Sequence, residues 1–90
     1  MNECAKKIFE IQVSTRAKIL YLCLCSCANK KGQASVSYNV LLKKLNLSSK
    51  TLLSNAIKEL TQSGLITKDN RLHKDGGIGV NLYTIHNWSE

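Results

Sequence analysis

Apolar and polar positions repeat at helical spacing in the segment 41–66, LLKKLNLSSKTLLSNAIKELTQSGLI. Four apolar side chains fall at i, i+3, i+4 and i+7 and share one helix face: Leu53, Ala56, Ile57 and Leu60. The opposite face carries hydroxyls, amides and a lysine: Thr51, Asn55, Lys58 and Gln62, with Ser54 on its flank. Such a helix can pack on a core while offering hydrogen-bond donors outward, as a helix in the DNA major groove must. The pattern predicts a recognition helix over about 49–63, with a shorter helix over about 37–45 before it.

A longer helix is predicted near the start of the chain, over about 14–28, with Ser14 as its N-cap and Gly32 beyond its end. Its predicted buried stripe comprises Ala17, Leu20, Tyr21, Leu24, Cys27 and Ala28, widened by Ile19, Leu22 and Cys23. We therefore expect this helix to be enclosed on more than one side. Two short extended pieces flank it: Gln33–Val36 after it, and before it a segment in which Phe9, Ile11 and Val13 alternate with polar residues.

The helix pair is framed by short capping and turn signals. Ser37 can cap the second helix, and either Ser48 or Ser49 can cap the third. Leu47 lies in the turn between them, where we expect it to fill the core. Gly64 follows the third helix as a C-terminal stop.

The period changes after the third helix. Leu65–Lys68 and Val80–Ile85 are rich in β-branched and aromatic residues, and Asp75–Gly77 between them favours a hairpin turn. This hairpin contains four basic side chains, with histidine included: Lys68, Arg71, His73 and Lys74. The predicted fold class is therefore α+β, a winged helix-turn-helix: three helices with a short strand and a C-terminal β-hairpin wing over about 65–85, forming one domain over 1–90.

The charge distribution points to a polyanionic partner. Thirteen basic residues against six acidic ones give a net charge of +7, and no acidic residue lies between Glu10 and Glu59. That stretch carries Arg16, Lys18, Lys30, Lys31, Lys43, Lys44, Lys50 and Lys58. From charge alone, a soluble lysine-rich domain explains this equally well, but the coincidence with the helix pair favours nucleic acid.

Other compartments and cysteine chemistries are not favoured. The longest mostly apolar run, Ile19–Cys27, is too short to span a bilayer, and the N-terminus lacks the pattern of a signal peptide, so we expect a cytoplasmic location and no membrane partner. Cys23, Cys25 and Cys27 form a C-x-C-x-C run unlike the usual zinc spacing. We expect Cys23 and Cys27 to fill the core on one face, with Cys25 pointing away.

Three fragments resemble the helix-turn-helix domains of plasmid and phage replication initiators and related bacterial transcriptional regulators. These are Ser14-x-x-Ala17-Lys18-x-Leu20-Tyr21-x-x-Leu24, Ala56-Ile57-Lys58-Glu59-Leu60-x-x-x-Gly64-Leu65-Ile66, and Gly76-Gly77 through Asn81-Leu82-Tyr83-Thr84. The resemblance covers residues 14–85 and implies a winged helix that binds duplex DNA in transcription regulation or replication initiation.

The chain departs from that group in three places. Val36–Ser37 stands where the group usually has proline and serine. The turn into the third helix is one residue longer than expected, and the periodicity favours Leu53 over Leu52 as the first buried residue. The group also usually carries more arginine on the third helix. Lysine contacts phosphate as a point charge, whereas arginine can clasp guanine with two bonds.

These observations predict binding of double-stranded DNA. Residues expected to face the major groove are Ser49, Lys50, Thr51, Ser54 and Asn55, because the N-terminal half of a recognition helix enters first. Asn55 is the best candidate for a base contact, since an amide can bond adenine at two points. Residues expected to bind phosphates are Lys58, Lys43 and Lys44, with Arg71, His73 and Lys74 reaching the backbone or minor groove from the wing. A homodimer is expected from the paired half-sites that such domains bind.

A second hypothesis is a protein-interaction or dimerisation module without DNA binding. Its supporting features are the cysteine-rich first helix, Leu52 and Trp88. An enzyme is not expected, because no nucleophile lies at recognisable spacing beside a base and no glycine-rich phosphate loop precedes a helix. We likewise expect no cofactor, no metal ion and no small-molecule ligand.

Overall fold

A computed structural model describes residues 7–70, 81–86 and 88 of the 90-residue chain. The elements follow the order η1 (Ile8–Glu10), α2 (Thr15–Cys27), β1 (Gln33–Val36), α3 (Tyr38–Leu45), α4 (Lys50–Gln62), β2 (Ile66–Asn70) and β3 (Asn81–Ile85). Together they form the three helices, the short strand and the paired C-terminal strands of an α+β winged helix-turn-helix, which confirms the predicted fold class.

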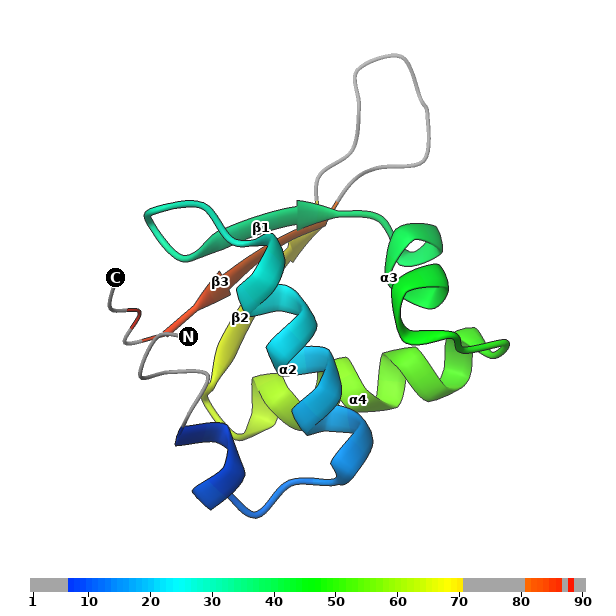
Figure 1. Cartoon of the computed structure of the whole chain (residues 1–90), viewed down its shortest axis with the longest axis horizontal. Helices are drawn as coiled ribbons and strands as arrows, with labels where there is room; N and C mark the ends of the chain where they lie inside the picture. The colour runs from blue at the N-terminus through cyan, green and yellow to red at the C-terminus, as the bar shows by residue number, and fades with distance from the viewer. Residues whose placement is uncertain (1–6, 71–80, 87, 89–90) are drawn as a thin grey trace.

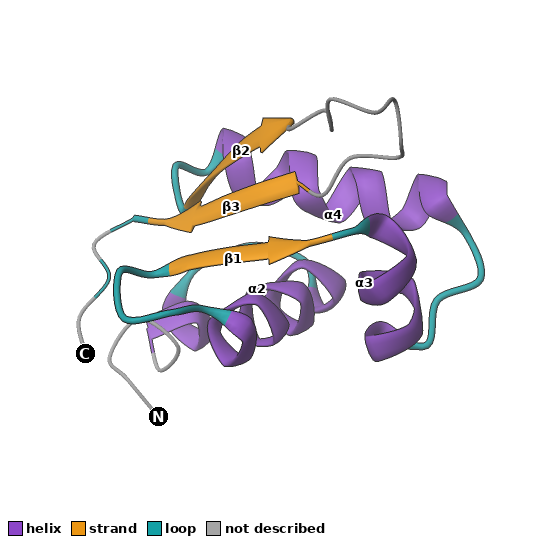
Figure 2. Cartoon of the chain, turned by 90° about the horizontal axis from the view of Figure 1, so that it is seen from above, coloured by secondary structure: helices purple, strands orange, loops and turns teal. Residues whose placement is uncertain are grey.

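The three strands form one antiparallel sheet in the order β1-β3-β2. Ala34 and Lys68 both pair with Tyr83 on the central strand, so these three residues are in register across the sheet. Two of the helices cover one side of the sheet, with α2 along β1 and α4 along β2, while α3 lies beyond the end of β1 (Figures 1 and 2). The arrangement leaves one long side of α4 uncovered.

The helix boundaries follow from local capping. The side chains of Ser14, Ser37 and Ser49 each accept a hydrogen bond from a backbone N–H in the first turn of the helix that follows. At the other end of α3, Asn46 takes a left-handed conformation with φ 55°, which asparagine tolerates better than most residues. Gly64 does the same after α4 with φ 76°, and Leu65 N–H donates to the carbonyl of Leu60 to close the helix end.

The core lies between the sheet and the helices. Its buried residues are Ile8, Ala17, Leu20, Tyr21, Leu24, Ala34, Leu41, Leu53, Ala56, Ile57, Leu60, Ile66, Tyr83 and Ile85. All four apolar positions of the predicted recognition helix are in this list, and Leu53 rather than Leu52 is the first fully buried one. Leu47 is half-buried at the edge of the core, between α3 and α4.

The prediction for the first residues is wrong in part. Residues Ile8–Glu10, which include Phe9, form the short helix η1, whereas Ile11 after it has the expected extended backbone, with φ −96° and ψ 137°. Ile8 is fully buried, whereas Phe9 is 61% exposed. Burial of Ile8 against α2 therefore determines the local conformation, and the alternation of Phe9, Ile11 and Val13 does not.

Two expectations for α2 also need correction. Ile19 does not widen the buried stripe, because it is 51% exposed. Cys23 and Cys27 are only half-buried, and Cys25 does not point away from the core but packs against its edge as they do. The reason is that α2 contacts helices α3 and α4 as well as strands β1 and β3, so its buried surface extends round most of the helix but ends short of Ile19.

Candidate nucleic-acid interface

The side of α4 that faces away from the core is polar and exposed. We call it the outer face of α4; its residues are Thr51, Ser54, Asn55, Lys58 and Gln62, all exposed. The opposite side of the same helix is 0–3% exposed. Lys50 is exposed in the first turn. Ser49 is half-buried, and its hydroxyl accepts a hydrogen bond from Leu52 N–H at 3.4 Å. Helical periodicity alone therefore presents amide, hydroxyl and ammonium groups to a partner.

The single carboxylate of α4 is directed elsewhere. Glu59 accepts a hydrogen bond from the backbone N–H of Ser14, the N-cap of α2. A carboxylate at a helix N-terminus satisfies an unpaired donor and meets the positive end of the helix dipole. The contact ties α4 to α2, and it also leaves the outer face of α4 without a negative charge.

The two lysines at the end of α3 do not share one environment. Lys43 and Lys44 are both exposed in its last turn. Burial and the neighbouring Cys27 raise the pKa of the Cys23 thiol on α2. The positive charge of Lys44 opposes this shift, so Lys44 acts on a group of α2. Both lysines remain exposed to a ligand.

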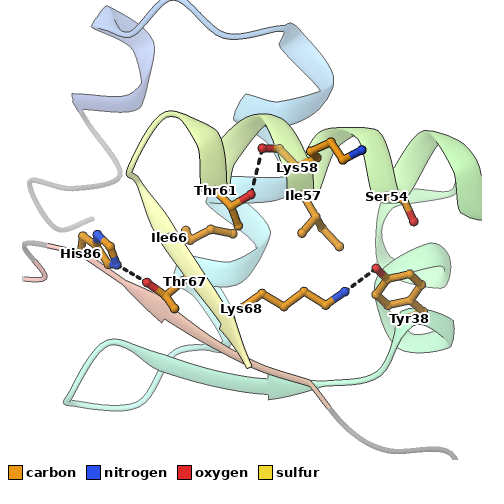
Figure 3. A pocket seen from close by; sticks show the side chains of 9 residues that line it. All are labelled: Tyr38, Ser54, Ile57, Lys58, Thr61, Ile66, Thr67, Lys68 and His86. Carbon is orange, nitrogen blue, oxygen red and sulfur yellow. Dashed lines mark hydrogen bonds between the residues drawn. The ribbon is translucent and has the colours of Figure 1, made fainter. Parts of the chain in front are cut away.

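An open groove of about 610 Å³ runs between α4 and β2. Its polar lining consists of Tyr38, Ser54, Lys58, Thr61, Thr67, Lys68 and His86, with Ile57 and Ile66 at its base (Figure 3). Thr61 Oγ1 donates to the carbonyl of Lys58 at 2.9 Å, and Thr67 shares a hydrogen bond with His86 Nε2. The groove adjoins the outer face of α4 because Ser54 and Lys58 belong to both.

Lys68 and Tyr38 form a specific contact across this groove. Lys68 Nζ donates to Tyr38 Oη at 2.8 Å and lies 4.9 Å from the centroid of the tyrosine ring, within the range of a cation–π contact. Partial burial raises the pKa of Tyr38, but hydrogen bonds from Lys68 and Ser54 and the charge of Lys68 outweigh it, so that its pKa is lowered. These residues lie 30 positions apart in the sequence, and no local pattern pairs them.

Tyr83 lies buried on the central strand near this pair. Its phenol accepts a hydrogen bond from Asn81 Nδ2 at 3.3 Å, and its side chain is 0% exposed. Burial raises its pKa to about 12; the bond from Asn81 opposes the shift and the nearby Tyr38 adds to it. Tyr83 is therefore a neutral, protonated part of the core at physiological pH.

The wing residues Arg71, His73 and Lys74 lie outside the described residues. Within the described part of the chain, no three His, Cys, Asp or Glu side chains are grouped so that they could hold a metal ion. Over the same residues, the longest apolar helix falls short of what a membrane span requires.

No curated protein and no solved structure matches the sequence. A family model described as a helix-turn-helix domain matches residues 12–66, which is more than half of the chain. The matched segment runs from the approach to α2 through both helices of the pair to the start of β2. The chain therefore belongs to this helix-turn-helix domain family.

Proposed function

We propose that this protein binds double-stranded DNA with the outer face of α4 in the major groove. The observation that carries the proposal is the contrast between the two sides of α4. One side is buried in the core, and the other side exposes hydroxyl, amide and ammonium groups. The one carboxylate of the helix, that of Glu59, accepts a hydrogen bond from Ser14 N–H. A helix inserted in the major groove needs this division.

The residues have different roles in this proposal. Lys50, Thr51, Ser54 and Asn55 lie in the N-terminal half of α4, which enters the groove first. Asn55 is exposed and can bond both N6 and N7 of an adenine. Lys58, Lys43 and Lys44 bind phosphates, which gives affinity without sequence selection. The wing residues Arg71, His73 and Lys74 would add further contacts to the backbone.

The helix-turn-helix family and the resemblance of the chain to initiators and regulators support two biological roles. We propose that the protein acts in the cytoplasm of a bacterium or on behalf of a phage or plasmid, as a transcriptional regulator or as the DNA-binding part of a replication initiator. In either role it is not an enzyme, and it binds paired half-sites as a homodimer. Selection of bound fragments from random DNA separates the roles, because inverted repeats favour a dimeric regulator and direct repeats favour an origin array.

Fluorescence anisotropy with a labelled duplex, measured across a series of salt concentrations, tests the proposal. About five phosphate contacts predict a slope of log K against log salt of about −4 to −5. Absence of binding at low salt would refute the proposal, and so would binding that does not depend on salt.

Two substitutions on α4 separate affinity from sequence preference. Lys50→Ala should weaken binding to every duplex by a similar factor. Asn55→Ala should instead reduce the preference between sequences, by about 1–3 kcal/mol for the base pair it contacts. Lys31→Ala is the matched control, because Lys31 is exposed in the loop between α2 and β1, at the other end of β1 from α3 (Figure 1).

A second candidate function is a protein-interaction surface between α2 and the end of α3. Ile19 is 51% exposed beside a groove of about 260 Å³ that Arg16, Leu45 and Leu47 also line. Leu52 and Trp88, the other features that suggested this function, are half-buried within the domain. Ile19→Lys should abolish self-association in sedimentation velocity experiments if this surface is the dimer contact, and should leave it unchanged otherwise.

A further inference from the structure

Lys68 is half-buried as a residue, and its ammonium lacks a carboxylate partner among the described residues. It faces the groove between α4 and β2, and no described residue that lines this groove is acidic. Its neighbour Asp69 is exposed and, because successive side chains in a strand alternate, points to the other face of the sheet. Partly burying a charge costs solvation free energy that an opposite charge can return. The groove therefore offers a positive charge that an anion can neutralise.

The contact with Tyr38 holds this ammonium in place without neutralising it. The neutral phenol accepts one hydrogen bond from Lys68 Nζ and offers its ring face to the charge. The remaining N–H donors of Lys68 stay available to a ligand. A lysine side chain that is already ordered loses less conformational entropy when it binds than a freely rotating surface lysine does.

Other donors lie at the same end of the groove. Figure 3 shows the side chains of Lys58 and Lys68 extending toward the end where Ser54 and Tyr38 lie. Two ammonium groups that line one open groove match an anion with several acceptor oxygens, and a phosphate group is the common biological example. The position beside the outer face of α4 is where the backbone of bound DNA would pass.

We propose that this groove binds one backbone phosphate of the DNA, with Lys68 as the charged ligand and Tyr38 as the residue that positions it. The inference rests on the proposed DNA-binding function and adds two residues to it, one from the start of α3 and one from β2. It also predicts that strand β2 of the wing takes part in DNA binding through Lys68. A free phosphate ion presents the same chemistry, and the experiment distinguishes the two sources.

The test uses the full chain, a labelled duplex and three variants: Lys68→Gln, Tyr38→Phe and the control Lys31→Gln. Lys68→Gln should weaken binding about tenfold for every sequence and make the salt slope shallower by about 0.9, the share of one phosphate. Tyr38→Phe keeps the ring and the charge of Lys68 but removes the hydrogen bond. It should weaken binding about threefold with the slope unchanged, since only the positioning is lost. Lys31→Gln should change neither.

The outcomes separate this inference from the function on which it rests. If the wild-type protein does not bind DNA, the proposed function fails. If it binds and Lys68→Gln behaves like Lys31→Gln while the circular dichroism spectrum and melting temperature match the wild type, the inference alone fails. Tyr38→Phe keeps the test decisive if Lys68→Gln unfolds the sheet, because an unchanged affinity in Tyr38→Phe also refutes the positioning role.

Inorganic phosphate distinguishes the source of the anion. In a titration of the ¹⁵N-labelled protein, the backbone phosphate proposal predicts weak, unsaturated shifts at Lys68 and Tyr38 with phosphate, and saturable shifts with the duplex. Saturable binding of phosphate alone that Lys68→Gln abolishes, together with an unchanged salt slope for DNA in that variant, would assign the groove to a free anion and overturn the proposal.

Discussion

Two glycines with almost the same backbone conformation should respond very differently to alanine. Gly32 has φ +78° and Gly64 has φ +76°, so an alanine at either site pays the cost of a left-handed conformation, about 1 kcal/mol. Around Gly64 there is open space. A Cβ at Gly32 would instead stand 2.5 Å from Cγ and 2.6 Å from Cβ of Trp88, so the indole must move. Overpacking of this kind costs about 1–3 kcal/mol more.

We therefore expect Gly64→Ala to lower the free energy of unfolding by about 1 kcal/mol and Gly32→Ala to lower it by about 2–4 kcal/mol. The indole is held by a hydrogen bond from Trp88 Nε1 to the carbonyl of Lys30 at 3.1 Å, and its movement should change the fluorescence of the only tryptophan. Urea denaturation followed by far-ultraviolet circular dichroism measures the free energies, and emission spectra report the indole.

A double-variant cycle isolates the steric part. In a Trp88→Gly background both Cγ and Cβ of residue 88 are absent, so Gly32→Ala should cost only about 1 kcal/mol, as at Gly64. Equal costs for Gly32→Ala and Gly64→Ala in the wild-type background would contradict the packing of Trp88 over Gly32. A cost of Gly32→Ala that does not change when Trp88 is removed would contradict it as well.

Three further predictions follow from the same structure. The pKa of Tyr83 is raised to about 12 in the folded state, so its contribution to the free energy of unfolding should be fully present below pH 10. It should be lost between pH 10 and about 12, by on the order of 2–3 kcal/mol, and Tyr83→Phe should remove this alkaline loss in urea titrations. Absorbance at 295 nm should show Tyr38 ionising below the usual tyrosine range; a Tyr38→Phe variant that keeps this early phase would contradict the assignment. Ser37→Ala should lower the free energy of unfolding by about 1 kcal/mol through loss of the α3 cap and leave DNA affinity unchanged, and reduced affinity in a fully folded sample would refute that separation.

Much of the fold follows from local signals in the sequence. The apolar spacing of α4, the serine caps and Gly64 each act over a few residues, so they could be recognised without the rest of the chain. The strand Gln33–Val36 was predicted with the boundaries that β1 has. These features agree with the tertiary structure because local preference and core burial favour the same conformation.

The failures come from contacts between distant segments. Phe9 and its neighbours alternate like a strand, but burial of Ile8 against α2 imposes a short helix. Ile19 lies on a flank of α2 that the described residues leave half open to solvent, which helical spacing alone cannot reveal. Tyr38 and Lys68 belong to different elements, so their pairing, and with it the groove, depends on how β2 packs beside α4.

The central claim is that the outer face of α4 meets DNA, and a titration of the ¹⁵N-labelled protein with a bound duplex tests it most directly. The largest amide shifts should fall between Lys50 and Lys58 and at Lys68, while Arg16 and Ile19 on α2 should change little. Large shifts around Ile19 with α4 unaffected would contradict it.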